Sequence, residues 1–393
     1  MKPIPYGKQY ISEEDIQAVI TTLQGEYLTQ GPKIKEFEDA FANYVGAKYA
    51  VALANGTAAL HLCAMALNVT EGQKVITTPI TFAASANCIR YCGGEVVFLD
   101  INPKAYTLDI NKVKALLETH PKGTFAGIIP VDFAGYAVDL EAFRQLADEY
   151  GMWIIEDACH APGGYFIDSK REKQLCGNGK YADLAIFSFH PVKHIASGEG
   201  GMITTNDEKL YKKLLQLRTH GIIKDDTQYT NSIEFAGGID AYPLWYMEMQ
   251  DLGYNYRITD FQAALGLSQL MRADKGLERR REIAQKYEQG FTAKNFINGQ
   301  SGVIDGHAYH LYVLEVENRL GLYNYLREHN IYAQIHYIPC HLMPYYRDLG
   351  WKEGDMPLAE NYYKQCISLP MYPTLTDEEQ NFVIKTIEGF YDI

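Results

Sequence analysis

The sequence has no long uncharged apolar segment. No run among its 393 residues approaches the roughly 18–20 consecutive apolar residues that a membrane-spanning helix needs. The first residues, MKPIPYGKQYISEED, also lack the apolar core of a secretory signal peptide. We therefore expect a soluble protein of the cytoplasm.

Positive charge is also scarce. Lysine and arginine number 36 against 49 aspartates and glutamates, which gives a net charge of −13 at neutral pH. Non-specific binding to nucleic acid requires a basic face, so this composition argues against it. A local basic pocket for an anionic small molecule is still compatible with the overall charge.

Motifs for disulfides, metals and nucleotides are missing as well. The seven cysteines are odd in number and form no CxxC pair, which favours free thiols in a reducing compartment. His336 and His341 do not have the spacing of two ligands on one helix face, and no group of acidic residues accompanies them. No Walker A motif occurs, and no GxGxxG follows a predicted strand. The sequence therefore predicts no metal site and gives no support for a nucleoside triphosphate or dinucleotide.

What the chain does have is a regular alternation of short apolar strands and helices. Segments such as GIIPV at 127–131 and MWIIE at 152–156 are the near-continuous apolar runs of strands buried on both faces. Helical patterns lie between the strands, and two more come first, at 12–23 and 33–45. This pattern predicts βαβ units, that is, a mainly parallel sheet with helices on both sides.

The pattern changes after residue 225. An irregular stretch rich in Tyr, Gly and Met runs to about residue 250, and 258–290 predicts one or two long helices. The basic run LERRREIAQK at 277–286 is most simply a solvated helix face, with contacts to a substrate phosphate as a minority alternative. Later strand and helix patterns predict a smaller α+β domain, closely packed on the first because no flexible linker separates them.

A strand passes into a helix at ANGTAALHL, residues 54–62. The free N–H groups of a helix start, together with a threonine hydroxyl, can hold a phosphate, and Gly56 and Thr57 stand at that position. Turns of this kind are common, so a purely structural role is the simpler interpretation of the motif alone.

Glu156 and Asp157 end another apolar strand. Ligands of open α/β sheets bind outside the carboxyl ends of the strands, so Asp157 can hold a positive charge on a ligand. Capping the following helix is an equally good interpretation. His160, three residues on, is a core histidine, a metal ligand or a ring that stacks on a flat group.

Lys193 follows a third predicted strand in FSFHPVKHIASGEGG, residues 187–201. A single lysine is usually a surface charge. A lysine withdrawn from water instead has its pKa lowered toward neutrality and becomes nucleophilic enough to form a Schiff base. The glycines at 198, 200 and 201 would let the backbone pass close to whatever this lysine holds.

These three sites together meet the needs of pyridoxal phosphate. Its phosphate needs N–H and hydroxyl donors, its pyridinium nitrogen needs a carboxylate, and its aldehyde needs a lysine. The 187–201 segment, with NGTAAL, TPITFAAS, EDACHA and GYNYRITDFQAALGLSQL, resembles the DegT/DnrJ/EryC1/StrS family of sugar aminotransferases over essentially the whole chain.

The resemblance implies an α/β fold of the fold-type-I, aspartate aminotransferase-like kind. A large cofactor-binding domain with a mainly parallel sheet is expected at 12–250, and a smaller α+β domain at 251–393. Residues 1–11 would pack against the small domain or a second subunit. The tyrosine-rich stretch at 241–256 is compatible with a subunit interface, and core is an equally good interpretation of it.

The resemblance also assigns roles to individual residues. Lys193 becomes the Schiff-base lysine and Asp157 the partner of the pyridine nitrogen, while Phe82 and His160 lie against the cofactor. Asn255 reaches the phosphate from a neighbouring subunit, which implies a homodimer with shared active sites. The other expected phosphate contacts are Gly56, Thr57, Ala58 and Ser188.

The segment HYIPCHLMPYYRDLGWKEG at 336–354 and the motif FHPVK resemble one branch of the family. That branch forms UDP-4-amino-4,6-dideoxy-N-acetyl-β-L-altrosamine in the pseudaminic acid pathway. The resemblance implies a ping-pong transfer of an amino group from L-glutamate, through Lys193, to C4 of a UDP-linked 4-keto-6-deoxy-N-acetylhexosamine. The substrate contacts would be Tyr6, Thr29, Gln30, Gly31, His336 and Tyr337. Where the branch more often has KxITTGEGG, this chain has KHIASGEGG.

Other functions fit parts of the sequence. The acceptor could be another nucleotide-linked keto sugar, of different stereochemistry or with its keto group at C3. Related sugar 3-dehydratases have a histidine in place of the lysine, so Lys193 argues against that activity. A non-catalytic regulator that binds the cofactor or a sugar nucleotide has no need of a Schiff-base lysine.

Overall fold

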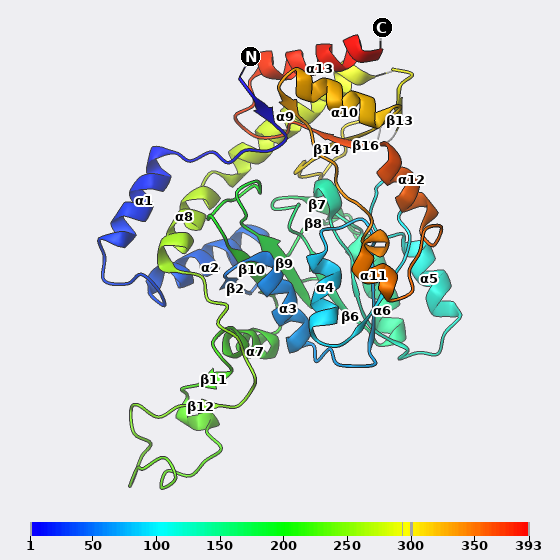
Figure 1. Ribbon diagram of the computed structural model, residues 1–393. Helices are drawn as coiled ribbons and strands as arrows, with labels where there is room; N and C mark the ends of the chain where they lie inside the picture. Colours follow the sequence, from blue (N-terminus) through cyan, green and yellow to red (C-terminus); the bar gives the residue numbers. More distant parts are fainter. Residues whose placement is uncertain (1, 293, 299–301, 392–393) are drawn as a thin grey trace.

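The computed structural model describes residues 2–292, 294–298 and 302–391. Its centre is a seven-stranded sheet in the order β2-β10-β9-β6-β5-β3-β4 (Figure 1). Within this sheet β10, Gly201–Thr205, runs antiparallel to both of its neighbours, β2 and β9, and the other strand pairs are parallel. The other strands are β2 Tyr49–Leu53, β3 Lys74–Thr77, β4 Glu95–Phe98, β5 Phe125–Ile129, β6 Trp153–Asp157 and β9 Leu184–Ser188. The predicted mainly parallel sheet is confirmed.

Helices cover both faces of this sheet. Because side chains alternate along a strand, Leu53 and Ile155 pack on one face while Ala52 and Phe187 pack on the other. The first face carries α3 Gly56–Ala66, α4 Ala84–Tyr91 and α7 Glu208–Arg218. The second carries α2 Pro32–Val45, α5 Ile110–Glu118, α6 Leu140–Tyr150 and α8 Asp260–Leu270.

The helix boundaries follow the capping chemistry of the sequence. Helix α1, Glu13–Leu23, begins with a capping box in which the Ser12 hydroxyl accepts from the Asp15 N–H and the Asp15 carboxylate accepts from the Ser12 N–H. Helix α2 ends at Gly46, whose φ of 80° is the left-handed conformation that glycine adopts without strain. The two helices predicted at 12–23 and 33–45 are therefore confirmed.

A second core lies in the C-terminal part, at the top of Figure 1. Strands β13 Ile297–Asn298, β14 Tyr312–Val316 and β16 Cys366–Leu369 form an antiparallel sheet. Helices α9 Ala273–Phe291, α10 Arg319–Glu328 and α13 Asp377–Tyr391 pack with it, and α11 Pro344–Asp348 and α12 Pro357–Gln365 lead back toward the large sheet. The N-terminal strand β1, Ile4–Pro5, pairs in parallel with β15, Ile331–Tyr332. The domain boundary at residue 250 stays a prediction.

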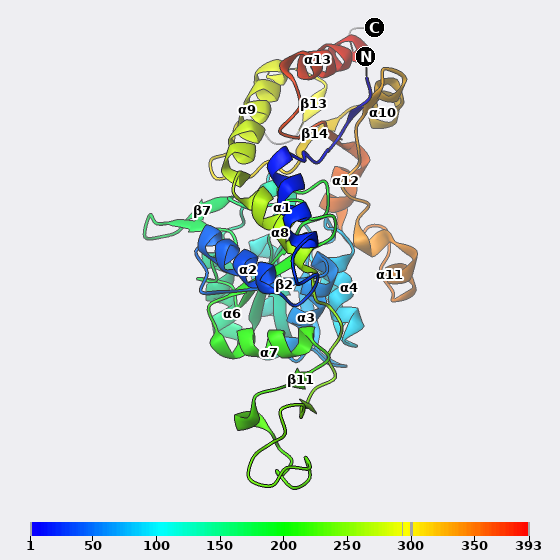
Figure 2. The same cartoon turned by 90° about the vertical axis from the view of Figure 1, so that its left-hand side faces the viewer.

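Two small hairpins project from the body. Strands β7 Tyr165–Ile167 and β8 Lys173–Leu175 form the first. The second is an arm over residues 222–252 that reaches away from the rest of the molecule in both views (Figures 1 and 2), with β11 Ile222–Ile223 paired to β12 Glu248–Met249. Its large apolar side chains, including Leu244 and Trp245, are exposed. The expectation that 241–256 is core is wrong for most of this stretch.

The basic run at 277–286 is only partly a solvated face. Arg280 is 2% exposed, and its Nη1 donates to the backbone carbonyls of Tyr309, His310 and Met371 at 3.2, 3.2 and 3.0 Å. The expectation is wrong here because α9 is covered along one side, a fact that charge alone does not reveal.

No helix in the described ranges is long and apolar enough to cross a membrane. All seven cysteines are free thiols.

Candidate active site

A cavity of about 950 Å³ opens beside the carboxyl ends of β6 and β9. Its size is at the upper end of the range for small-molecule sites, so it has room for a cofactor together with a substrate. Residues from both ends of the chain reach it. The predicted site residues that line it are Tyr6, Gly56, Thr57, Ala58, Phe82, Asp157, His160, Ser188, Lys193, His336 and Tyr337.

The other predicted residues do not line the cavity of their own chain. Thr29 forms a β-bridge with Thr259, and the Gly31 N–H donates to Asp260 at 2.7 Å, so the segment 29–31 is held at the start of α8. A role of this segment in substrate binding stays a prediction.

Asn255 is also absent from the cavity wall, although both of its neighbours are part of it. Tyr254 and Tyr256 line the cavity, and their rings stack at 5.0 Å. Since side chains alternate along an extended segment, the Asn255 side chain points the other way, while its backbone pairs with that of Thr219 in a β-bridge. This orientation is compatible with a contact to a second subunit.

The start of α3 forms one end of the cavity. The Asn55 side chain caps the helix by accepting from the Ala58 N–H at 2.8 Å. No described residue accepts a hydrogen bond from the N–H of Gly56 or Thr57, and both residues face the cavity. Two free N–H groups at a helix N-terminus, where the helix dipole is positive, are suited to a phosphate.

Asp157 is fixed on the cavity wall by two hydrogen bonds. Its Oδ2 accepts from the Ser85 hydroxyl at 2.6 Å, and its Oδ1 accepts from the Cys159 N–H at 3.2 Å. Each carboxylate oxygen has a further lone pair for a ligand. The sequence prediction missed Ser85, although it lies in TPITFAAS three residues after Phe82, on the first turn of α4.

Lys193 presents its amine to the same cavity. Its backbone N–H donates to the His190 carbonyl at 2.8 Å, while its Nζ has no hydrogen bond or ion pair with the described residues. Burial lowers the pKa of this amine below its usual value of 10.5, and the nearby Cys159 and Asp157 act in the opposite direction. A lowered pKa leaves more of the amine in the neutral form, which acts as a nucleophile and a base.

His160 lies beside Lys193 as a neutral ring. The Ala134 N–H donates to its Nδ1 at 3.2 Å, so the proton of the neutral ring is on Nε2, which lies 3.4 Å from the Tyr337 hydroxyl oxygen. Its ring centroid is 4.2 Å from that of His310. Burial lowers the pKa of His160 well below 6.5, and the charge of Lys193 adds to this effect.

Three further histidines near Lys193 have lowered pKa values for the same main reason. Burial lowers the pKa of His194 and His310 well below 6.5 and that of His336 to about 3. The charge of Lys193 lowers the pKa of each of them further. At neutral pH these rings are therefore uncharged.

An aromatic group that the sequence did not suggest forms another part of the cavity wall. His61 is one turn after Thr57 on α3, and its Nδ1 lies 3.1 Å from the Tyr256 hydroxyl oxygen. Tyr91 and Tyr254 pack edge-on to His61 at 5.4 and 5.0 Å. The helical spacing of His61 from Thr57 was the available signal.

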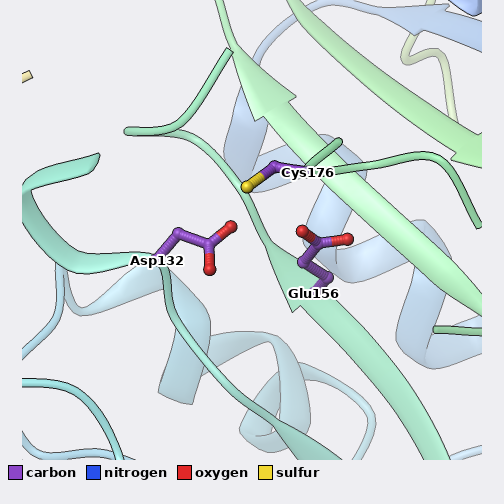
Figure 3. Close-up of side chains that lie close together, drawn as sticks. All are labelled: Asp132, Glu156 and Cys176. Atoms are coloured by element: carbon purple, nitrogen blue, oxygen red, sulfur yellow. The ribbon is translucent and has the colours of Figure 1, made fainter. Parts of the chain in front are cut away.

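The histidines predicted not to form a metal site have other partners. His336 Nδ1 lies 2.8 Å from the Ser368 hydroxyl oxygen, and His341 Nε2 lies 3.0 Å from Glu360 Oε1. Among the residues that the structure describes, one group of three side chains has the types and proximity of metal ligands: Asp132, Glu156 and Cys176 (Figure 3). It does not line the cavity.

The residues present fit pyridoxal phosphate. The free N–H groups of Gly56 and Thr57 and the Ser188 hydroxyl suit its phosphate, Asp157 suits its protonated ring nitrogen, and the unpaired amine of Lys193 suits its aldehyde. A mainly parallel sheet whose strand ends hold this combination defines a pyridoxal phosphate-dependent transferase of the aspartate aminotransferase-like fold.

Comparison with known proteins gives the same class of enzyme and identifies one family within it. The model of the DegT/DnrJ/EryC1/StrS aminotransferase family matches residues 9–388. The chain therefore belongs to this family of pyridoxal phosphate-dependent sugar aminotransferases.

Similar proteins match this chain along nearly its whole length. It is 38% identical to the spore coat polysaccharide biosynthesis protein SpsC of Bacillus subtilis over 98% of this chain and 96% of that protein. It is 36% identical to the UDP-4-amino-4,6-dideoxy-N-acetyl-beta-L-altrosamine transaminase of Campylobacter jejuni, with the same coverage of 98% and 96%. The solved structure of Helicobacter pylori PseC, an aminotransferase involved in the biosynthesis of pseudoaminic acid, is similar with a TM-score of 0.86 at 27% identity, covering 100% of both chains.

Gly201 makes room for the turn at the start of α3, and its replacement tests whether that turn binds the phosphate. A Cβ atom at Gly201 would lie 2.5 Å from the Asn55 carbonyl oxygen and 2.8 Å from the Gly56 nitrogen, which are backbone atoms. Since they move only if the start of α3 moves, we expect Gly201→Ala to raise the dissociation constant for pyridoxal phosphate by about tenfold or more, and to cost ~1–3 kcal/mol of stability.

Spectroscopic titration of the apoprotein with cofactor measures this effect. The control is Gly276→Ala in α9, where the added Cβ would lie 3.6 Å from its nearest neighbour. Unchanged affinity in Gly201→Ala would contradict the prediction. Of the glycines after Lys193, Gly200 and Gly201 have protein atoms as close neighbours, since a Cβ at Gly200 would meet the Ser197 hydroxyl oxygen, whereas a Cβ at Gly198 would have no neighbour within 4 Å.

Proposed function

We propose that the protein transfers an amino group from L-glutamate to C4 of a UDP-linked 4-keto-6-deoxy-N-acetylhexosamine, giving UDP-4-amino-4,6-dideoxy-N-acetyl-β-L-altrosamine. The observation that carries the reaction type is the unpaired Lys193 amine in one cavity with Asp157 and the free N–H groups of α3. The similarity to the Campylobacter jejuni transaminase and to Helicobacter pylori PseC supports the choice of acceptor.

Different residues would bind different parts of the cofactor. The N–H groups of Gly56 and Thr57 and the Ser188 hydroxyl hold the phosphate. Asp157, oriented by Ser85, accepts a hydrogen bond from the pyridine nitrogen and keeps that nitrogen protonated. Pyridoxal phosphate supplies the electron sink that stabilises negative charge at the carbon losing a proton.

Lys193 moves the proton. Its neutral amine would act as the base that removes the proton from the donor Cα and as the acid that returns a proton, chemistry for which bound pyridoxal phosphate would supply the electron sink. The lowered pKa of Lys193 favours this base form near neutral pH. Release of 2-oxoglutarate ends the first half-reaction, and the same proton transfers in reverse place the amino group on C4 of the sugar.

The acceptor would bind at the side of the cavity lined by the two ends of the chain. Tyr6, His336 and Tyr337 lie there together, and the Tyr6 and His336 rings are 5.2 Å apart. His336 is neutral, so it can offer a hydrogen bond to a sugar hydroxyl or carbonyl without adding charge. Phe82, which is 63% exposed, stands at the mouth of the cavity.

A homodimer in the cytoplasm is part of this proposal. The arm over 222–252 exposes apolar side chains, among them Leu244, Trp245 and Leu252, of the kind that a subunit interface covers. The arm leads directly into the segment that carries Asn255, which faces away from the cavity of its own chain. A second copy would receive this side chain at its phosphate site.

Following the two half-reactions separately tests the function. We expect the visible absorption band of the protein with bound pyridoxal phosphate to bleach with L-glutamate, and to return with UDP-4-keto-6-deoxy-N-acetyl-β-L-altrosamine. Bleaching by glutamate without recovery would keep the aminotransferase and reject this acceptor. A protein that binds no cofactor would contradict the proposal as a whole. L-Glutamate without the keto sugar serves as the control for spontaneous recovery.

A further inference from the structure

The buried carboxylates of Asp132 and Glu156 lie close to each other, with the thiol of Cys176 beside them (Figure 3). Asp132 is 0% exposed, Glu156 1% and Cys176 2%, and one ligand atom of each lies within 4.8 Å of the others. Asp132 follows β5, and Glu156 immediately precedes Asp157 in β6. Since side chains alternate along a strand, Glu156 points to the sheet face opposite Asp157.

Each carboxylate uses one oxygen in a backbone hydrogen bond and leaves the other without a partner. Asp132 Oδ1 accepts from the Val138 N–H at 3.0 Å, and Glu156 Oε2 accepts from the Gly177 N–H at 2.9 Å. Asp132 Oδ2 and Glu156 Oε1 have no partner among the described residues. Neither carboxylate forms an ion pair with a described lysine, arginine or histidine.

Two negative charges cannot both persist in such a site. Burial disfavours the ionised form of each group, and the charge of one disfavours ionisation of the other. A proton on one of the two free oxygens removes both problems, since it can be donated to the other oxygen. We propose that Asp132 and Glu156 share a single proton, and that the resulting hydrogen bond makes them positioning residues for Asp157.

Backbone hydrogen bonds connect this pair to Asp157. The Asp132 N–H donates to the Asp157 carbonyl at 3.0 Å, and the Asp157 N–H donates to the Pro130 carbonyl at 2.9 Å. A pair that lost its proton would repel across the β5–β6 boundary, and the displacement would reach the backbone of Asp157. The inference rests on the role proposed above for Asp157 toward the cofactor.

The electrostatic surroundings agree with this geometry. Burial raises the pKa of Asp132 to about 7 and that of Glu156 well above its usual value. The other titratable groups that face the pair are Asp157, Cys159 and Cys176, and none of them carries a positive charge. The folded-state pKa is thus above the unfolded value of 3.8, so the stability contribution is full below pH 3.8 and is lost as the pH rises through about 7.

A metal ion fits the group less well than a proton does. Each carboxylate already has an N–H donor on one oxygen. A metal would also require the thiolate of Cys176, whereas burial raises the pKa of this thiol well above its usual value. A metal ion bound by Asp132, Glu156 and Cys176 would contradict the shared proton.

Amide substitutions test proton sharing directly. In Glu156→Gln or Asp132→Asn, the amide oxygen can keep the backbone hydrogen bond while the NH2 group replaces the shared proton as donor. In the double variant Asp132→Asn/Glu156→Gln, two NH2 groups face each other and no acceptor remains. We expect each single variant to keep its melting temperature within about 2 °C, and the double variant to lose ~5 °C or more.

The pH dependence of each variant provides the second measurement. From pH 5 to pH 8, an interval that spans the folded-state pKa of about 7 for Asp132, the dissociation constant for pyridoxal phosphate should rise about tenfold more in the wild-type protein than in Glu156→Gln, whose donor does not titrate. The melting temperature of the apoprotein should show the same difference, with the wild type falling and Glu156→Gln staying level. This second readout does not depend on the proposed function, so the two proposals can fail separately.

Four results would overturn the inference. They are a double variant as stable as the single ones, equal pH profiles of wild type and Glu156→Gln, a stoichiometric metal ion found by elemental analysis, or a melting temperature lowered by chelator. Cys176→Ala is the companion variant: the thiol lowers the pKa of both carboxylates, so its loss should move the pH profiles to higher pH without abolishing them. Asp157→Asn separates the role of Asp157 from that of the pair, since it should weaken cofactor binding while the apoprotein keeps its pH dependence, moved to lower pH because the charge of Asp157 raises the pKa of Asp132.

Discussion

Replacement of Lys193 by alanine should reduce turnover at least about 10⁴-fold, because in the proposed function this amine both holds the cofactor and moves the proton. The fold should persist. Lys193 Nζ makes no hydrogen bond or ion pair with the described residues, so its removal breaks no structural contact. Steady-state turnover of L-glutamate and the keto sugar measures the loss, and the visible band of the bound cofactor should shift or vanish.

Two further variants sharpen this test. Lys193→Arg keeps the positive charge but cannot form the Schiff base, so it should be as inactive as the alanine variant. Lys209→Ala, on the exposed side of α7, is the matched control and should keep full activity. Turnover of Lys193→Ala within tenfold of the wild type, with an unchanged spectrum, would remove Lys193 from the mechanism.

Replacement of Asp157 by asparagine should lower the rate of the glutamate half-reaction about 10³-fold. Asparagine has nearly the same shape, but without the negative charge the pyridine nitrogen loses its proton and the ring becomes a poor electron sink. Cofactor affinity should fall by about tenfold, since the paired charge is lost in a buried site. Stopped-flow bleaching of the cofactor band measures the rate, and a titration measures the affinity.

Ser85→Ala is the companion variant. It removes one of the two hydrogen bonds that orient Asp157 while leaving the charge in place. We expect a loss of about tenfold in the same half-reaction, smaller than that of Asp157→Asn. Equal losses in the two variants would mean that orientation matters as much as charge, and a fully active Asp157→Asn would exclude the pyridine contact.

The residues that sequence reasoning placed in the cavity have a common position. Gly56 comes after β2, Asp157 ends β6, and Lys193 follows β9 by five residues. In a mainly parallel sheet such strand ends meet at one edge, so local patterns were sufficient to bring them together. The sheet itself was also predictable from local patterns, because short apolar strands alternate with helices along the chain.

Long-range packing decided the features that the sequence did not reveal. The partnership of Asp132 with Glu156 joins residues 24 positions apart, and no local periodicity links them. The burial of Arg280 depends on carbonyls from Tyr309, His310 and Met371, which lie far along the chain. The position of 29–31 beside Asp260 likewise depends on how α8 packs.

The uncharged histidines around Lys193 have a consequence for the electric field at the amine. An imidazole of ordinary pKa would gain and lose its charge between pH 5 and 8, and each change would alter the field that its neighbours experience. Burial lowers the pKa of His160, His194 and His310 well below 6.5 and that of His336 to about 3, so these rings are uncharged at neutral pH. Near neutral pH these four rings therefore add no changing charge to the field at Lys193, and the neighbours that act on the pKa of its amine are Cys159, Asp157 and Arg280.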